Sequence, residues 1–185
     1  MGVLASLWAA GPTLRQLQNI LQDKGIRFSR SLLYEVAIQL LEALEDIHQL
    51  GVVHSDVKPE NVLVTGTSHV VVTLIDFGVA KLPPSALTEE EPDVFSPFDG
   101  PGTAFYMSPE ALQGRAHVDH RSDLYSVGVL LQEMLGMTSL QECEGIGPFT
   151  TPFLRKSLHP DPRHRFATAN DMKTALQDLQ EAQHR

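Results

Sequence analysis

A short polar stretch, His54–Asn61, carries side chains whose types and spacing suit phosphoryl transfer. It reads His-Ser-Asp-Val-Lys-Pro-Glu-Asn and lies between the apolar runs Val-Val and Val-Leu-Val. Asp56 could orient a hydroxyl proton, Lys58 could hold a moving phosphate, and the Asn61 amide could supply an oxygen ligand to Mg²⁺. The β-branched residues on both sides predict a polar loop held between two buried strands.

A second oxygen ligand lies fifteen residues beyond Asn61. Asp76-Phe77-Gly78 follows the apolar run 70–75, which predicts another strand. Hard cations such as Mg²⁺ bind oxygen ligands, so the Asp76 carboxylate would complement Asn61. Glycine takes positive φ without cost, and Gly78 is therefore expected to make the turn that aims Asp76. The sequence predicts a magnesium site formed by Asn61 and Asp76.

These two motifs, in this order, resemble the catalytic loop H-R-D-x-x-x-x-N and the metal loop D-F-G of eukaryotic-type protein kinases. Ser108-Pro109-Glu110 stands in the place of the family's A-P-E, and 102–110 resembles the substrate-positioning loop of the Ser/Thr enzymes. The resemblance implies a Ser/Thr protein kinase-like domain that uses ATP and Mg²⁺. It implies a mainly α (α+β) C-terminal lobe with a central buried helix F and small β-hairpins around the catalytic and metal loops.

The resemblance also implies a role for individual residues. Catalysis is assigned to Asp56, Lys58 and Thr103; ATP binding to Leu63, Lys58 and Asn61; and the metal to Asn61 and Asp76. Leu63 would form the floor under the adenine ring, supported by Leu130 and Met134. Three architectural expectations follow: that His54 stacks on Phe77, that Asp123 fixes the catalytic-loop backbone, and that Glu110 pairs with Arg165.

Helix signals predict the elements that position these residues. A capping box at Thr13–Gln16 predicts a short helix to about Gln22, and Ser29 or Ser31 opens a long helix that ends at Gly51. Helices are also expected over Thr151–Leu158 and after Thr168. The segment Asp123–Leu135 is apolar on nearly all sides, which predicts a helix in the centre of the domain.

Composition narrows the function classes. The 185 residues suit one domain, and Lys+Arg 14 against Asp+Glu 23 gives a net charge of −9, which argues against nucleic-acid partners. The single cysteine, Cys143, excludes an internal disulfide framework and favours a reducing, cytoplasmic setting. No apolar run reaches the ~18–20 residues of a membrane helix. Met1–Ser6 does match the short N-myristoylation pattern, which would give a lipid anchor.

The resemblance extends over residues 1–185 as one kinase-like domain, but only to the family's lower lobe. Residues 1–12 would be the remnant of the hinge strand. Residues 76–110 would be the activation segment, and Leu82–Gly102 carries five prolines and an acidic run. The sequence contains no glycine-rich phosphate loop, no Val-Ala-Ile-Lys strand and no helix C glutamate. A kinase normally needs that lysine–glutamate pair.

Two classes of function remain open from the sequence. The retained catalytic set favours a Ser/Thr protein kinase, while the missing upper lobe resembles the non-catalytic kinase C-lobe (KIND) domains, which act as interaction modules. A third reading is a fragment or short isoform of a full kinase. Burial of adenine on a leucine-sized surface contributes roughly 1.5–3 kcal/mol. Millimolar binding needs about 4 kcal/mol, so an isolated lobe is expected to bind nucleotide weakly.

The surface that an upper lobe would cover is also expected to recruit a protein. Leu63 and Phe77 would stay open to water, and apolar patches larger than a few hundred Å² usually mark a contact surface. The alternative is that residues 1–12 fold back over the site with Trp8. The sequence therefore predicts a protein substrate or a protein that covers this surface.

Ser55 stands where the family has arginine, and this difference predicts an unusual response to phosphorylation. The arginine normally pairs with a phosphorylated residue of the activation segment in a strong charge-assisted contact, which serine cannot make. Glutamate at Ser85, Thr88 or Ser96 should therefore leave phosphotransfer rates unchanged, measured against the same substitutions in a Ser55→Arg variant. A large activation by these substitutions in the Ser55 protein would contradict the prediction.

Overall fold

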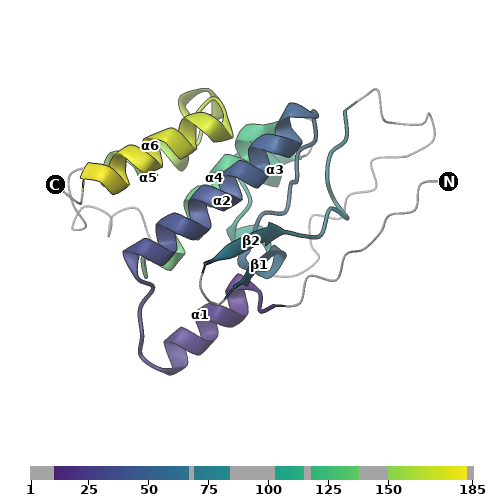
Figure 1. Ribbon diagram of the computed structural model, residues 1–185. Helices are drawn as coiled ribbons and strands as arrows, with labels where there is room; N and C mark the ends of the chain where they lie inside the picture. Colours follow the sequence, from purple (N-terminus) through teal and green to yellow (C-terminus); the bar gives the residue numbers. More distant parts are fainter. Residues whose placement is uncertain (1–10, 67–68, 84–102, 115–117, 138–149, 183–185) are drawn as a thin grey trace.

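The computed structural model describes residues 11–66, 69–83, 103–114, 118–137 and 150–182 (Figure 1). The fold is mainly helical with one small antiparallel sheet, as expected. The helices are α1 (Leu14–Asp23), α2 (Arg30–Gln49), α3 (Pro109–Gln113), α4 (His120–Met134), α5 (Thr150–Ser157) and α6 (Ala169–Ala182). The strands are β1 (Val62–Thr65) and β2 (Val71–Leu74), and the short 3₁₀ turns are η1 (Pro59–Asn61), η3 (Thr103–Phe105) and η6 (Pro162–His164). None of the helices in this part of the chain combines the length and apolar character needed to cross a bilayer.

The first two helices begin and end where their capping residues predicted. The Thr13 hydroxyl accepts from the Gln16 amide, and the Gln16 side chain accepts from the Thr13 amide, which completes a capping box. Ser29, and not Ser31, caps α2 by accepting from the Leu32 amide at 3.1 Å. Gly51 follows α2 with φ 75°, a conformation that glycine adopts without steric cost.

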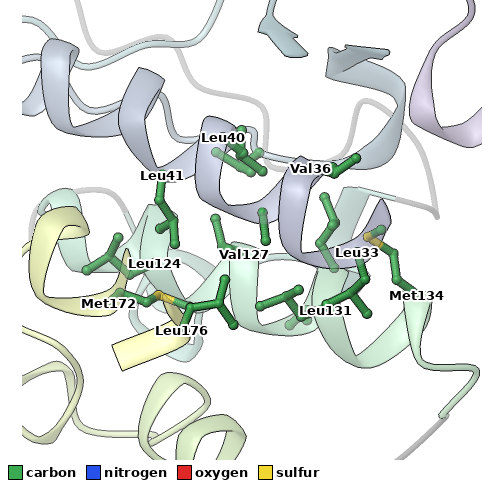
Figure 2. Close-up of a cluster of buried hydrophobic side chains, with 14 of the residues drawn as sticks. Leu33, Val36, Leu40, Leu41, Leu124, Val127, Leu131, Met134, Met172 and Leu176 are labelled. Carbon is green, nitrogen blue, oxygen red and sulfur yellow. The ribbon is translucent and has the colours of Figure 1, made fainter. Parts of the chain in front are cut away.

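Helix α4 lies at the centre of the buried apolar cluster, which confirms the expected central helix. Figure 2 shows side chains of α2 and α6 meeting those of α4. The labelled members are Leu33, Val36, Leu40 and Leu41 from α2, Leu124, Val127, Leu131 and Met134 from α4, and Met172 and Leu176 from α6. The helix begins at His120, three residues before the expected start at Asp123, because the Asp119 carboxylate caps it by accepting from the Arg121 amide.

The sheet differs from the expected pattern on one side of the catalytic loop. β1 and β2 pair antiparallel from Val62↔Leu74 to Thr65↔Val71, so one hairpin joins the catalytic and metal loops. The apolar residues 52–53 do not form the predicted strand. Val53 makes only an isolated bridge with Lys81, because a two-residue run offers too little backbone for a ladder.

The residues before α1 run along the free edge of β1. Thr13 bridges Leu63, and the Val64 amide donates to the Pro12 carbonyl at 3.0 Å. A Cβ placed on Gly11 would lie 2.2 Å from Cγ2 of Thr65, so only glycine permits this approach. The start of α1 is thereby tied to the strand that follows the catalytic loop.

Gly128 lets α4 pack closely against the end of α5, which yields a stability prediction. A Cβ there would lie 2.8 Å from Cβ of Ser157 and 3.0 Å from Cδ2 of Leu158. Alanine favours a helix over glycine by about 1 kcal/mol. We nevertheless expect Gly128→Ala to lower the free energy of unfolding by about 1–3 kcal/mol, because overpacking displaces buried neighbours.

Urea unfolding measures this loss. Gln177→Ala, at an exposed position of α6, serves as the control and should change the free energy of unfolding little. A higher free energy of unfolding for Gly128→Ala would contradict the prediction, because it would show that α4 and α5 accommodate the added methyl group without loss of stability.

Candidate active site

The catalytic loop is fastened to the core by the carboxylate of Asp123 in α4. One oxygen accepts from the His54 amide at 2.9 Å and the other from the Ser55 amide at 2.8 Å. The His48 Nε2 lies 2.8 Å from the first oxygen. Because Asp123 is only 1% exposed, these contacts offset the cost of burying its charge. The expectation that Asp123 fixes the loop backbone is confirmed.

Ser55 takes a backbone conformation that is uncommon for a side-chain-bearing residue. Its φ is 66°, in the left-handed region, which costs roughly 1–2 kcal/mol for an L residue. The bond from its amide to Asp123 holds this conformation. The turn directs the following residue, Asp56, away from the core and toward Lys58 and Asn61.

Asp56, Lys58 and Asn61 form one hydrogen-bonded cluster. The Lys58 Nζ lies 2.7 Å from Oδ2 of Asp56, and the Asn61 Nδ2 donates to the same oxygen at 2.9 Å. The Asn61 Nδ2 also donates to the Asp56 carbonyl at 2.9 Å. The side chains of Asp56 and Lys58 are 13% and 19% exposed, so both can still meet a ligand. Since both bonds use the amide nitrogen, the amide oxygen of Asn61 is the atom that could bind a cation.

The metal loop is joined to the catalytic loop through Ile75. Its amide donates to the Asn61 carbonyl at 2.9 Å, and its carbonyl lies 3.1 Å from Nε2 of His54. The next residue, Asp76, has an exposed side chain. Phe77 packs edge-on against His54 with ring centroids 4.8 Å apart, which confirms the expected stacking.

The turn at Asp76 differs from the sequence expectation. The positive φ, 65°, belongs to Asp76 itself, whereas Gly78 is not among the glycines with positive φ. The Gly78 amide instead donates to Oδ1 of Asp76 at 3.2 Å. Asp76 tolerates the left-handed conformation because its short polar side chain bonds locally. A Cβ at Gly78 would lie 3.1 Å from that same oxygen, so the glycine gives the carboxylate room.

The donor set fits a hard divalent cation. The Asp76 carboxylate and the Asn61 amide oxygen come from loops that one backbone hydrogen bond joins, and Mg²⁺ prefers such oxygen ligands. Among the described residues no three His, Cys, Asp or Glu side chains gather at one point. A bound Mg²⁺ would therefore take its other ligands from phosphates and water, as this ion usually does.

Leu63 and Phe77 were both expected to be exposed to water, and only one of them is. Leu63 is only 7% exposed, so the expectation that it stays open to water is wrong. Both edges of its strand are paired, with β2 on one side and Thr13 on the other. Phe77, in contrast, is 45% exposed, as expected.

The backbone of Thr103 lies in η3, while its side chain falls outside the described part of the chain. Most of the expected activation segment, residues 84–102, also falls outside it.

Glu110 and Arg165 form the expected ion pair beneath the substrate-positioning loop. Two parallel bonds of 2.6 and 2.7 Å join the guanidinium to the carboxylate, and Ser122 donates a third at 2.7 Å. Burial alone would raise the pKa of Glu110. The bonds from Arg165 and Ser122 outweigh it and lower the pKa to about 2.

The structure adds a cluster around Arg15 that the sequence did not indicate. Its guanidinium meets Glu60, Tyr106 and Glu133, which come from three other segments of the chain. Arg15 lies within the capping box Thr13–Gln16, a pattern that predicts a helix and not a site. No local pattern links a residue to one 118 positions further along.

A helical lobe whose central helix anchors an Asp–Lys–Asn loop beside an Asp-Phe-Gly turn defines the lower lobe of a protein kinase. The sequence profile described as "Protein kinase domain" matches residues 11–146 of this chain. The chain therefore belongs to the protein kinase family.

Three similar curated proteins carry serine/threonine kinase names. The chain is 40% identical over 133 residues to Serine/threonine-protein kinase pkn3 of Myxococcus xanthus, covering 70% of this chain and 24% of that protein. It is 32% identical over 193 residues to a Clostridium perfringens protein named Probable serine/threonine-protein kinase CPE1738, covering 89% and 26%. A similarly named Streptomyces coelicolor protein, SCO3848, is 33% identical over 190 residues, covering 90% and 26%. The chain thus spans about a quarter of the length of these relatives.

The Glu110–Arg165 pair predicts a pH-dependent contribution to stability. The folded-state pKa of about 2 lies below the ordinary value of 4.5, so the contribution is present above the ordinary value and is lost as the pH falls through 2. We expect Glu110→Gln to be markedly less stable than the original chain near pH 7. The difference should shrink as the pH falls from about 4.5 toward 2.

Denaturant unfolding at a series of pH values measures this difference. Glu181→Gln, which changes an exposed carboxylate of α6, is the matched control and should give a pH-independent offset. A constant difference between Glu110→Gln and the original chain down to pH 2 would contradict the assignment.

Proposed function

We propose that this domain transfers the γ-phosphoryl group of magnesium-bound ATP to serine or threonine hydroxyls of proteins. The observation that carries the proposal is the cluster at Asp56, whose Oδ2 is held by Lys58 at 2.7 Å and by Asn61 at 2.9 Å. Such a carboxylate is pre-oriented and has a second oxygen available for a hydroxyl. Positioning of this kind supplies most of the catalysis in phosphoryl transfer.

Each residue of the cluster has a distinct part in this proposal. Asp56 accepts and orients the hydroxyl proton of the substrate. Lys58 lies within reach of Asp56 and would hold the γ-phosphate as charge moves onto its oxygens. Thr103, whose backbone begins the turn η3, would contact the catalytic aspartate from the substrate side. The protein substrate would lie along the segment that contains η3.

Asn61 and Asp76 would hold Mg²⁺, which neutralises charge on the phosphates when bound. The amide oxygen of Asn61 is oriented by the two bonds from its nitrogen to Asp56. The bond from the Gly78 amide orients the carboxylate of Asp76. Both ligands are thus supported by a second set of hydrogen bonds, which favours tight metal binding.

The burial of Leu63 reduces the contribution that apolar contact with adenine could make to nucleotide binding. A side chain that is 7% exposed offers little apolar area to an adenine ring. The metal and phosphate contacts would therefore carry most of the binding free energy. Nucleotide affinity is expected to depend strongly on Mg²⁺.

A second function, a non-catalytic interaction module, is favoured by one specific observation. Phe77 remains 45% exposed beside the catalytic loop even though Leu63 is covered. An exposed aromatic residue at this point is a suitable contact for a protein that covers the site. The two functions predict different results in a nucleotide titration, because only the first requires Asp76.

Asp76→Asn should abolish the magnesium-dependent part of nucleotide binding. The substitution keeps the shape of the side chain but removes the anionic ligand. We expect the ADP affinity of this variant to be the same in Mg²⁺ and in EDTA, while the original chain binds more tightly in Mg²⁺. Isothermal titration calorimetry with ADP measures both.

Asp178→Asn, which removes an exposed carboxylate from α6, controls for the change in net charge and should keep the Mg²⁺ effect. An equal Mg²⁺ effect in Asp76→Asn and the original chain would exclude Asp76 as a ligand. The absence of any nucleotide binding by the original chain would favour the interaction module instead.

A further inference from the structure

The guanidinium of Arg15 is the point at which four separate segments of the chain meet. Its Nε donates to Oε1 of Glu60 at 2.7 Å, and its Nη1 donates to Oε1 of Glu133 at 2.7 Å. Its Nη2 donates to the Tyr106 hydroxyl at 2.6 Å. The Tyr106 hydroxyl in turn donates to the other oxygen of Glu133. Gln18, one turn along α1, accepts a further bond from Nη1 at 2.9 Å.

The residues in this cluster come from both sides of the proposed active site. Glu60 lies in η1, directly before Asn61, and Glu133 lies near the end of α4. Tyr106 follows η3, in the segment proposed to carry the substrate. Arg15 itself lies in the first turn of α1, directly after the residues that run along the edge of β1. The cluster therefore joins the strand next to the nucleotide site with the segment next to the protein substrate.

Charge and burial indicate that the cluster is held together by Arg15. Two carboxylates face one guanidinium, whose side chain is only 29% exposed. Burial would lower the pKa of Arg15, but the bonds that it donates to Glu133 and Glu60 outweigh burial, so the pKa rises and the positive charge is retained. Burial and the bond to Glu133 raise the pKa of Tyr106, so its hydroxyl stays protonated. Without Arg15, Glu60 and Glu133 would remain close together with no cation between them.

The geometry also requires arginine in particular. A planar guanidinium presents several N–H groups in a fixed fork, and here three nitrogens serve acceptors in different segments. A lysine ammonium is a point charge on a flexible stem. It could neutralise Glu60 or Glu133 but could not orient the Tyr106 hydroxyl at the same time.

We propose that Arg15 is a positioning residue that holds the Tyr106 turn against Glu60 and so sets the affinity for protein substrates and not for the nucleotide. The inference rests on the proposed function, because it assumes that the segment around Tyr106 carries the substrate. Arg15 contacts neither Asp56 nor Asp76 among the bonds described above. Its effect is therefore exerted through the position of the turn.

Hydrogen exchange and steady-state kinetics on Arg15→Ala and Arg15→Lys test this proposal. We expect Arg15→Ala to speed amide exchange about tenfold in residues 103–107 and 60–61, with exchange in α6 unchanged. With dephosphorylated casein as the probe substrate, its KM for casein should rise about tenfold, and its KM for magnesium-ATP should change less than about twofold. Arg15→Lys should restore the exchange rate at 60–61 but only partly at 103–107.

Arg163→Ala is the matched control, because Arg163 also pairs with a carboxylate, Asp161, but at an 80% exposed surface position. It should change neither KM nor the exchange rate at 103–107. Equally faster exchange in α6 and in the Tyr106 turn of Arg15→Ala would make Arg15 a general stabiliser and overturn the proposal. Unchanged exchange at 103–107, or equal increases in both KM values, would overturn it as well.

The same measurements distinguish a failure of the proposed kinase function from a failure of the positioning role of Arg15. If no variant phosphorylates casein and none binds ADP, the kinase function and the substrate role both fail. Exchange at 103–107 still responds to Arg15→Ala in that case if the residue positions the turn. ADP binding that persists in Arg15→Ala together with a raised KM for casein supports both proposals.

Discussion

The buried carboxylate of Asp123 is the interaction on which the rest of the active site depends. It is 1% exposed and lies on the central helix α4, yet both of its oxygens are committed to the backbone of the catalytic loop. A buried charge of this kind is stable only while its hydrogen bonds persist, so the loop and the helix form one rigid unit. The bonds also hold Ser55 in its left-handed conformation, from which Asp56 projects. The position of the Asp56 carboxylate, the proposed catalytic group, is therefore set by a helix of the apolar core.

Hydrogen bonds and one ring contact also connect the catalytic loop to the metal loop. His54 is bound through its amide to Asp123, and its ring meets both the Ile75 carbonyl and the Phe77 ring. Asn61 accepts from the amide of Ile75 and donates to Asp56. The two loops that supply the candidate ligands are thus held by backbone contacts. The side chain of Asp76 is exposed, whereas Asn61 is only 5% exposed.

Two guanidinium groups join the substrate-positioning segment to the core, and they differ in burial. The side chain of Arg165 is fully buried and donates two hydrogen bonds to Glu110, which suits a fixed architectural contact. Arg15 is 29% exposed and spreads its bonds over Glu60, Glu133 and Tyr106. Water and ions reach this second cluster more easily, so its strength is more sensitive to salt. The segment is therefore anchored at α3 by a fully buried ion pair. At Tyr106 it is anchored by the more exposed Arg15 cluster and by a buried hydrogen bond from the Ser126 hydroxyl to the Tyr106 carbonyl.

The sequence by itself determined the helix start at Thr13, the central place of α4 and the identity of the motif residues, and it limited the start of α2 to Ser29 or Ser31. Those signals are local, since a cap bonds an amide two or three residues away and an apolar face repeats within one helix. The tertiary structure decided that Val53 forms only a bridge and that Asp76, not Gly78, takes the positive φ. It also brought Arg15 to its carboxylates. These features depend on the space and hydrogen bonds offered by distant segments, which no spacing within the sequence encodes.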